Sequence, residues 1–164
     1  MMSCVRWLVV AAAVTTIAPC FASAQVRVSA GAGAGIAGGT DASLSEGRSA
    51  PVVMAQVSTS ALIGVGLEAD AWWRSGSSVV VATGDLQLHL PSTSFFVKVG
   101  GGFGRGDPDG KGTIDGTAAH IGAAYDVHVP DTRVALTLFA NGFVVYTASR
   151  SLQMVDGGVA ITLR

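Results

Sequence analysis

Charged and histidine side chains recur at every second position along several short segments, and they are the residues in this chain that could do chemistry. Glu68, Asp70 and Arg74 are separated by even numbers of positions in one segment, and so are Asp126 and His128 in a later segment. In an extended strand such residues point to one face. Carboxylates beside histidines can move protons or hold a cation. The full set expected on the charged face is Arg27, Glu68, Asp70, Arg74, Asp85, Lys98, His120, Asp126, His128, Asp156 and Arg164.

A catalytic interpretation of this set would pair His120, as the base, with Asp85 or Asp126 as the group that orients it. No serine or cysteine nucleophile accompanies the pair, so we predict no catalytic residues. Two of the three histidines, His120 and His128, lie eight positions apart, which forms no compact ligand group. We therefore predict no metal site.

Two short motifs have simpler explanations than ligand binding. Residues 33–38 match the glycine spacing of a dinucleotide-binding loop, but that motif needs a helix after its strand, and here a polar stretch follows. Arg105-Gly106-Asp107 matches an integrin-binding tripeptide, and nearby aspartates could attract calcium. The Asp-Pro-Asp-Gly run that begins at Asp107 is sufficient as turn chemistry. We predict no cofactor.

The charged positions lie on segments that alternate apolar and polar residues with a period of two. This is the pattern of β-strands with two different faces. Most segments have roughly the 9–11 residues that a tilted membrane strand needs. Pro51 makes the second segment the weakest. We expect strands at 26–36, 51–58, 61–73, 79–90, 95–104, 117–129, 133–145 and 152–164.

Alternation alone does not say which face points inward. A soluble barrel would put the apolar face inside, around an apolar ligand, whereas a membrane barrel puts it outside. Three features favour the membrane barrel: a nearly uncharged apolar face, a secretion signal, and aromatic residues near strand ends. The expected interfacial aromatic residues are Trp72, Trp73, Phe143 and Tyr146 at one rim and Phe95 at the other.

The first 24 residues have the features of a cleaved secretory signal peptide. A short apolar stretch follows Arg6, and Ala22-Ser23-Ala24 is a small-x-small cleavage pattern. Both cysteines, Cys4 and Cys20, lie in this segment. Residues 25–164 then form one domain with nine basic and eleven acidic residues. That balance offers no basic patch for nucleic acid.

The mature chain resembles the small outer-membrane β-barrel superfamily, which includes the OmpA transmembrane domain, OmpX and the opacity-type proteins. The resemblance covers residues 25–164 and depends on the Gly-rich first strand at 31–35, the hairpin rhythm, and the closing segment 157–164. It implies an all-β fold, an eight-stranded antiparallel up-and-down transmembrane β-barrel in the cell outer membrane. It also implies outer-membrane lipid and the barrel assembly machinery as partners, and a monomer.

An eight-stranded barrel is only wide enough for side chains to fill its interior. We therefore expect the charged face to form a paired, structural network that closes the lumen, and the protein to have a structural or surface-interaction role without catalysis. Tight turns alternate with longer connections, so any specificity is expected in the outer loops 38–50 and 105–116. A narrow proton or ion path, a lipid-modifying enzyme and a soluble apolar-ligand carrier are the alternatives.

Overall fold

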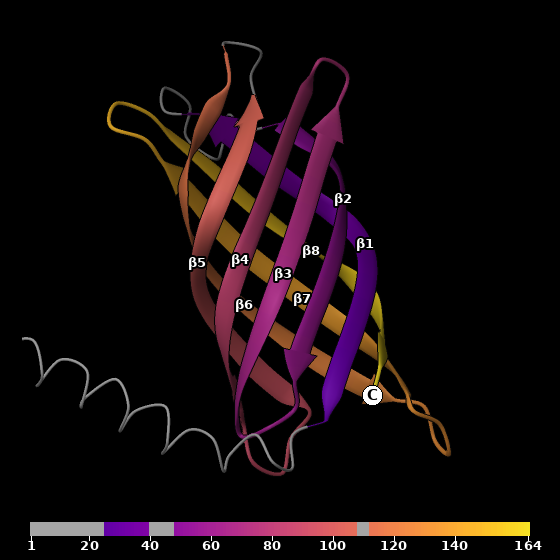
Figure 1. Ribbon diagram of the computed structural model, residues 1–164. Coiled ribbons are helices and arrows are strands. Elements are labelled where there is room, and N and C mark those ends of the chain that lie inside the picture. The colour runs from indigo at the N-terminus through magenta and orange to yellow at the C-terminus, as the bar shows by residue number, and fades with distance from the viewer. Residues whose placement is uncertain (1–24, 40–47, 108–111) are drawn as a thin grey trace, which may run out of the picture.

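The computed structural model describes residues 25–39, 48–107 and 112–164, which form eight β-strands (Figure 1). The strands overlap all eight predicted segments, so the predicted all-β fold is confirmed. The proposed signal peptide lies outside the described residues. The strands are β1 (Val26–Gly39), β2 (Arg48–Thr59), β3 (Ile63–Arg74), β4 (Ser77–His89), β5 (Phe95–Asp107), β6 (Ile114–His128), β7 (Val134–Tyr146) and β8 (Ser151–Leu163).

The sheet closes on itself because the first strand pairs with the last. Each strand is antiparallel to the next along the chain, and β1 pairs with β8 from Val28 opposite Leu163 to Gly39 opposite Leu152. Closure leaves no sheet edge, as a β-structure surrounded by lipid requires. Both the start of β1 and the end of β8 lie at one end of the barrel, which we call the periplasmic end; the other is the outer end (Figure 1). No helix among the described residues is long and apolar enough to cross a membrane.

The strands are longer at the outer end than the sequence indicated. β2 begins at Arg48 and β6 at Ile114, so the loops expected at 38–50 and 105–116 are partly strand. The connection expected at 74–78 is a tight turn, because β3 pairs with β4 up to Arg74 opposite Ser77 and Gly76 takes the positive φ that the turn needs. The expected contrast of turn lengths is therefore wrong at this connection.

Pro51 weakens β2 on one side only. β2 pairs with β1 over its whole length, from Arg48 to Thr59, but its pairing with β3 begins only at Val52. Proline has no backbone N–H to donate, so it is tolerated where a ladder ends. The second strand is thus intact, and its weak side is the outer end of the β2–β3 seam.

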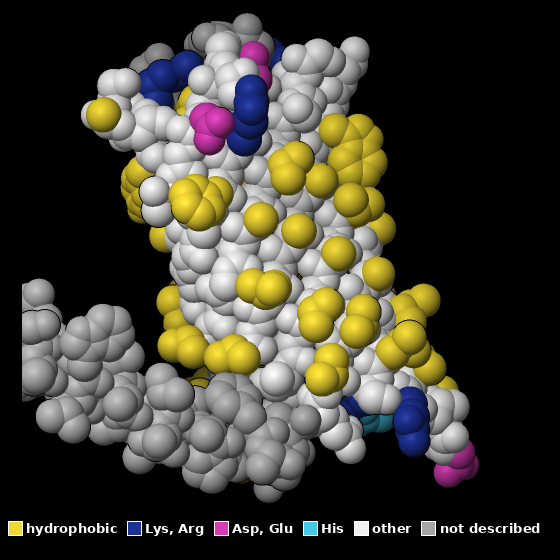
Figure 2. Space-filling view, viewed as in Figure 1, with side chains coloured by type: hydrophobic (Ala, Val, Ile, Leu, Met, Phe, Trp, Pro, Cys, Tyr) yellow, Lys and Arg dark blue, Asp and Glu magenta, His cyan; other side chains and the backbone are white. Residues whose placement is uncertain are grey.

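The side chains alternate between a buried inner face and an exposed outer face along every strand. Leu67, Val99 and Ile121 are among the outward residues and are more than half exposed. In Figure 2, hydrophobic side chains cover the middle of the visible wall, and charged side chains gather at its two ends. This outward apolar belt has the form of the lipid-contacting surface of a membrane barrel.

Inward-facing glycines on β1 and β5 form two corners on opposite walls of the barrel. A Cβ on Gly33 would lie 2.0 Å from the carbonyl oxygen of Gly157, and one on Gly102 would lie 2.0 Å from that of Ala82. The strands on either side of each corner approach one another, β2 with β8 and β4 with β6. Glycine is the residue that permits such tight bends in a barrel wall.

Placing a methyl group in one corner should destabilise the barrel. For Gly102→Ala we expect a loss of about 1–3 kcal/mol in the free energy of unfolding, because the added Cβ overpacks against backbone. Urea unfolding in lipid vesicles, followed by tryptophan fluorescence, measures this loss. The matched control is Gly84→Ala on the outward face, where the nearest atom would lie 3.8 Å away. Equal effects of the two substitutions would contradict the corner interpretation.

Candidate functional site

The barrel interior collects most of the residues that the sequence put on the charged face. Arg164 is partly buried where β8 ends, while Arg74 and His128 are exposed at opposite ends. These two share the inward parity, but they are the last residues of β3 and β6, so their side chains extend past the wall to solvent. The buried members are Arg27, Glu68, Asp70, Asp85, Lys98, His120, Asp126 and Asp156.

Glu68 is the centre of the polar layer in the middle of the lumen. One carboxylate oxygen forms an ion pair with Lys98 and accepts a hydrogen bond from Gln56, and the other accepts one from Asn141 Nδ2 at 2.8 Å. These partners come from β5, β2 and β7, so the network joins strands from different sides of the barrel. A buried carboxylate needs such partners because an isolated buried charge is very costly.

His120 belongs to the same layer and is held through both of its ring nitrogens and through its ring face. Its Nδ1 lies 2.7 Å from an Asp85 oxygen, its Nε2 lies 3.4 Å from Asn141 Oδ1, and its ring stacks on Phe143 at 4.4 Å between centroids. Of the two carboxylates considered for it, Asp85 is the partner. Among the described residues, the hydroxyl that contacts the ring is Thr83 Oγ1, 3.4 Å from the same Nδ1 that meets Asp85. The described residues thus offer the pair no separately activated nucleophile.

The middle layer holds more carboxylates than cations. Within the described part of the chain, Asp70 accepts a single long hydrogen bond, from Asn141 at 3.4 Å, and Asp156 lies opposite Asn141 across the β7–β8 seam. Neither oxygen of Asp156 has a hydrogen-bond partner among the described residues. Asp156 therefore contributes burial cost without the compensating bonds that Glu68 has. No group of three or more His, Cys, Asp or Glu in the described part of the chain is arranged to hold a metal ion.

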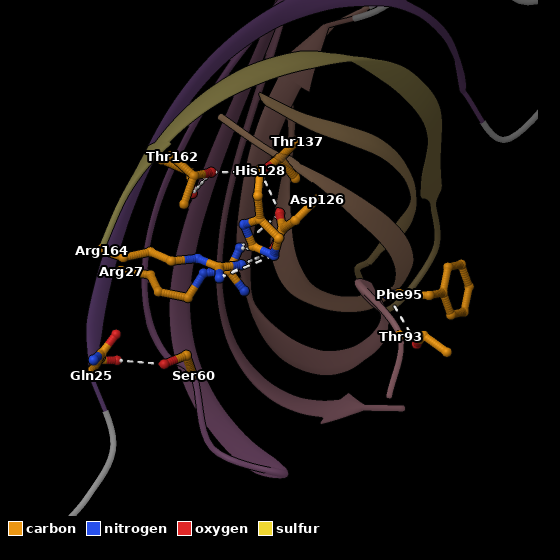
Figure 3. A network of polar contacts seen from close by, with 11 residues as sticks. Gln25, Arg27, Ser60, Thr93, Phe95, Asp126, His128, Thr137, Thr162 and Arg164 are labelled. Carbon is orange, nitrogen blue, oxygen red and sulfur yellow. Dashed lines mark hydrogen bonds and ion pairs between the residues drawn. The ribbon is translucent and has the colours of Figure 1, made fainter. Parts of the chain in front are cut away.

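A second polar cluster surrounds Asp126 near the periplasmic end (Figure 3). Arg27 Nη2 donates to both Asp126 oxygens at 3.0 and 2.8 Å, and Arg164 Nη2 donates to one at 2.6 Å. Thr137 donates to the other oxygen at 2.6 Å and continues through Thr162 to Ser29. Asp126 therefore lies in a different cluster from His120, and each of its oxygens accepts two hydrogen bonds.

Apolar side chains fill the interior above and between these polar clusters, which the sequence interpretation missed. Trp72 is fully buried and donates its indole N–H to the Gly35 carbonyl at 3.2 Å. It packs in an outer-end cluster with Phe143, Val79, Leu152 and other residues. Below the middle layer lies a smaller cluster of Met54, Phe96, Ala124, Phe139 and Ala160.

The predicted interfacial location is therefore wrong for two of the aromatic residues. Trp72 and Phe143 point inward, whereas Trp73 and Tyr146 point outward and are 45% and 52% exposed. The reason is the alternation of side chains along a strand. Trp72 is two residues from Asp70 and Phe143 is two residues from Asn141, so each lies on the same face as a buried polar residue. That signal was present in the sequence for both residues.

Three solved structures have the same architecture. The chain aligns with Neisserial surface protein A with a TM-score of 0.66 at 8% identity, covering 86% of this chain and 98% of that one. It aligns with Ail, the attachment invasion locus protein of Yersinia pestis, with a TM-score of 0.52 at 11% identity, covering 85% and 99%. The N-terminal barrel domain of Pseudomonas aeruginosa OprF gives 0.51 at 12% identity, covering 86% and 100%.

These likenesses establish the fold. All three proteins are eight-stranded outer-membrane β-barrels, so the expected class, an eight-stranded transmembrane β-barrel of the outer-membrane type, is confirmed. The outward apolar belt is the surface that such a barrel presents to lipid. No protein-family model and no curated protein matches the sequence.

The difference between Glu68 and Asp156 predicts unequal effects on stability of two substitutions, each of which removes one buried charge. Lys98→Met should cost about 3–5 kcal/mol of unfolding free energy because it leaves Glu68 buried without its cation. Asp156→Asn should cost less than about 1 kcal/mol or should stabilise, because it removes an unpartnered charge. Urea unfolding in vesicles compares the two variants. A larger loss for Asp156→Asn would show that Asp156, rather than Glu68, is the essential carboxylate.

Proposed function

We propose that the protein is a non-catalytic outer-membrane barrel with a structural or surface-interaction role, whose lumen is closed by its own side chains. The observation that carries this proposal is the layered interior. Large side chains occupy it at successive levels: Trp72 at the outer end, Lys98 in the middle and Phe96 below. Each is at most 2% exposed, as expected of a filled interior.

The polar residues support closure more than conduction. An ion path needs groups that can exchange partners with a passing ion. Glu68, Lys98 and His120 are instead bonded to one another or to neighbouring strands, and Asp126 is saturated by two arginines and a threonine. The same bonding argues against catalysis, because His120 has its nitrogens directed at Asp85 and Asn141. The apolar-ligand carrier is disfavoured because the inner face carries the charges.

The proposed partners follow from the membrane location. Outer-membrane lipid contacts the apolar belt, the barrel assembly machinery inserts the chain, and the barrel works as a monomer. A surface role would use the outer end, where Arg105 and Asp115 form an exposed ion pair at 3.9 Å across β5 and β6. The related fold of Ail was solved with the heparin analogue sucrose octasulfate, so sulfated glycans are a reasonable first class of surface ligand to test here.

Single-channel recording in planar lipid bilayers tests closure. The unmodified protein should insert and give no conductance steps. A variant with Trp72, Lys98 and Phe96 all replaced by Ala should conduct, because one large side chain is removed from each level of the lumen. The matched control replaces three outward residues, Leu67, Val99 and Ile121, by Ala and should stay silent. Reproducible steps from the unmodified protein would refute a closed lumen and favour an ion path.

A further inference from the structure

Two arginines face each other across the end of the β7–β8 seam, beside the periplasmic mouth. The last pair in the ladder is Val134 opposite Leu163, and the backbone N–H of Arg164 donates to the Arg133 carbonyl at 3.0 Å. Arg133 and Arg164 are therefore direct cross-strand neighbours on the inward parity. Like charges directly opposite each other destabilise a sheet unless an anion lies between them.

Asp126 forms an ion pair with Arg164, but it shares its charge with Arg27, and the structure shows no ion pair between Asp126 and Arg133 among the described residues. Asp126 already accepts hydrogen bonds from Arg27, Arg164 and Thr137, so that each of its two oxygens accepts two hydrogen bonds. The exposed side chain of Arg133 has no hydrogen bond or ion pair among the described residues. Among the described residues, Asp131 on the same turn is the other carboxylate side chain at this end, and it too is exposed.

Several guanidinium N–H groups near the mouth have no hydrogen-bond acceptor among the described residues, although the Arg27 guanidinium lies over the Phe96 ring at 4.8 Å from its centre. Arg27 is 99% buried, yet its Nε and Nη1 have no partner among the described residues, and neither does Arg164 Nε. Arg164 Nη1 lies 3.3 Å from His128 Nε2; because a guanidinium can only donate, the histidine nitrogen accepts. Figure 3 shows the Arg27 and Arg164 guanidinium groups side by side, with His128 next to them.

A cavity of about 600 Å³ opens beside these groups. Its charged and histidine lining residues are His128, Asp131, Arg133 and Arg164, so two arginines face one carboxylate, and Val26, Val129 and Val134 form its apolar side. The three valines belong to the outward parity, so the cavity lies where the barrel mouth meets the membrane surface. Such a site combines positive charge with apolar walls, which suits an anionic group carried on, or close to, a lipid.

We propose that this mouth binds a phosphate-bearing anion between Arg133 and Arg164. A phosphate has enough acceptor oxygens to take hydrogen bonds from two guanidinium groups at once. The Asp126 carboxylate has no such capacity left, because each of its oxygens already accepts two hydrogen bonds. The phosphate belongs either to a phospholipid headgroup of the periplasmic leaflet or to a free phosphate. The site shares Arg164 with the cluster around Asp126 but lies at the mouth, away from the levels of Trp72, Lys98 and Phe96 that close the lumen.

The test uses the whole protein in micelles of a phosphate-free maltoside detergent, titrated with inorganic phosphate while NMR follows the arginine Nε–H signals. Saturable shifts of the Arg133 and Arg164 signals are expected. Arg133→Gln should weaken binding about tenfold or more, since one charge-assisted contact is lost. It should do so without loss of folding, because that side chain holds no other contact. Arg164→Gln should weaken binding to a similar extent, and Arg74→Gln at the outer end is the matched control.

Adding phosphatidylglycerol to the micelles distinguishes the two sources. If the site takes a phospholipid headgroup, the lipid will compete with inorganic phosphate and raise its apparent dissociation constant. If the site takes free phosphate, the titration will be unchanged by the lipid. Both outcomes support an anion site. Absence of saturable shifts, or equal affinities in the unmodified protein and Arg133→Gln, would overturn the proposal.

Discussion

The pairing of β1 with β8 is the constraint on which the rest of the structure depends. Within lipid a backbone N–H or C=O has no water to bond, so an open sheet edge is not tolerated. Closing only eight strands leaves a narrow interior and requires sharp bends in the wall. The bends account for the inward glycines at Gly33 and Gly102, where a side chain would collide with backbone. The narrow interior accounts for the buried side chains that occupy the lumen.

The interior is organised in levels, and charge is distributed unevenly among them. The middle level has an excess of carboxylates around Lys98 and His120, while the periplasmic end has an excess of guanidinium groups around Asp126. Apolar clusters lie above and between them. The apolar clusters separate the two polar groups, which limits how far either can exchange partners. This arrangement fits a barrel stabilised by internal pairing better than one that moves ions or substrates.

Strand positions and faces could be predicted from the sequence because alternation is a local property of the chain. The same alternation also predicts that Trp72 points inward, because it lies two residues from Asp70 and therefore on the same face of the strand. The partners within the lumen could not be predicted. Whether His120 meets Asp85 or Asp126 depends on the stagger of strands that are far apart in sequence, and alternation carries no information about stagger. The cross-strand neighbours Arg133 and Arg164 flank the consecutive strands β7 and β8, and their register depends on the exact length of the turn that joins these strands.

Adjacent tryptophans on opposite faces allow the central claim, that the apolar face meets lipid and the charged face fills the lumen, to be measured directly. In a Trp7→Phe background, Trp72→Phe leaves Trp73 alone, and Trp73→Phe leaves Trp72 alone. Each protein is reconstituted into vesicles of lipid brominated near the headgroup end of its acyl chains. The account predicts strong quenching of Trp73 fluorescence and little quenching of Trp72. Quenching of Trp72 with Trp73 unaffected would mean that the faces are inverted and would contradict the account.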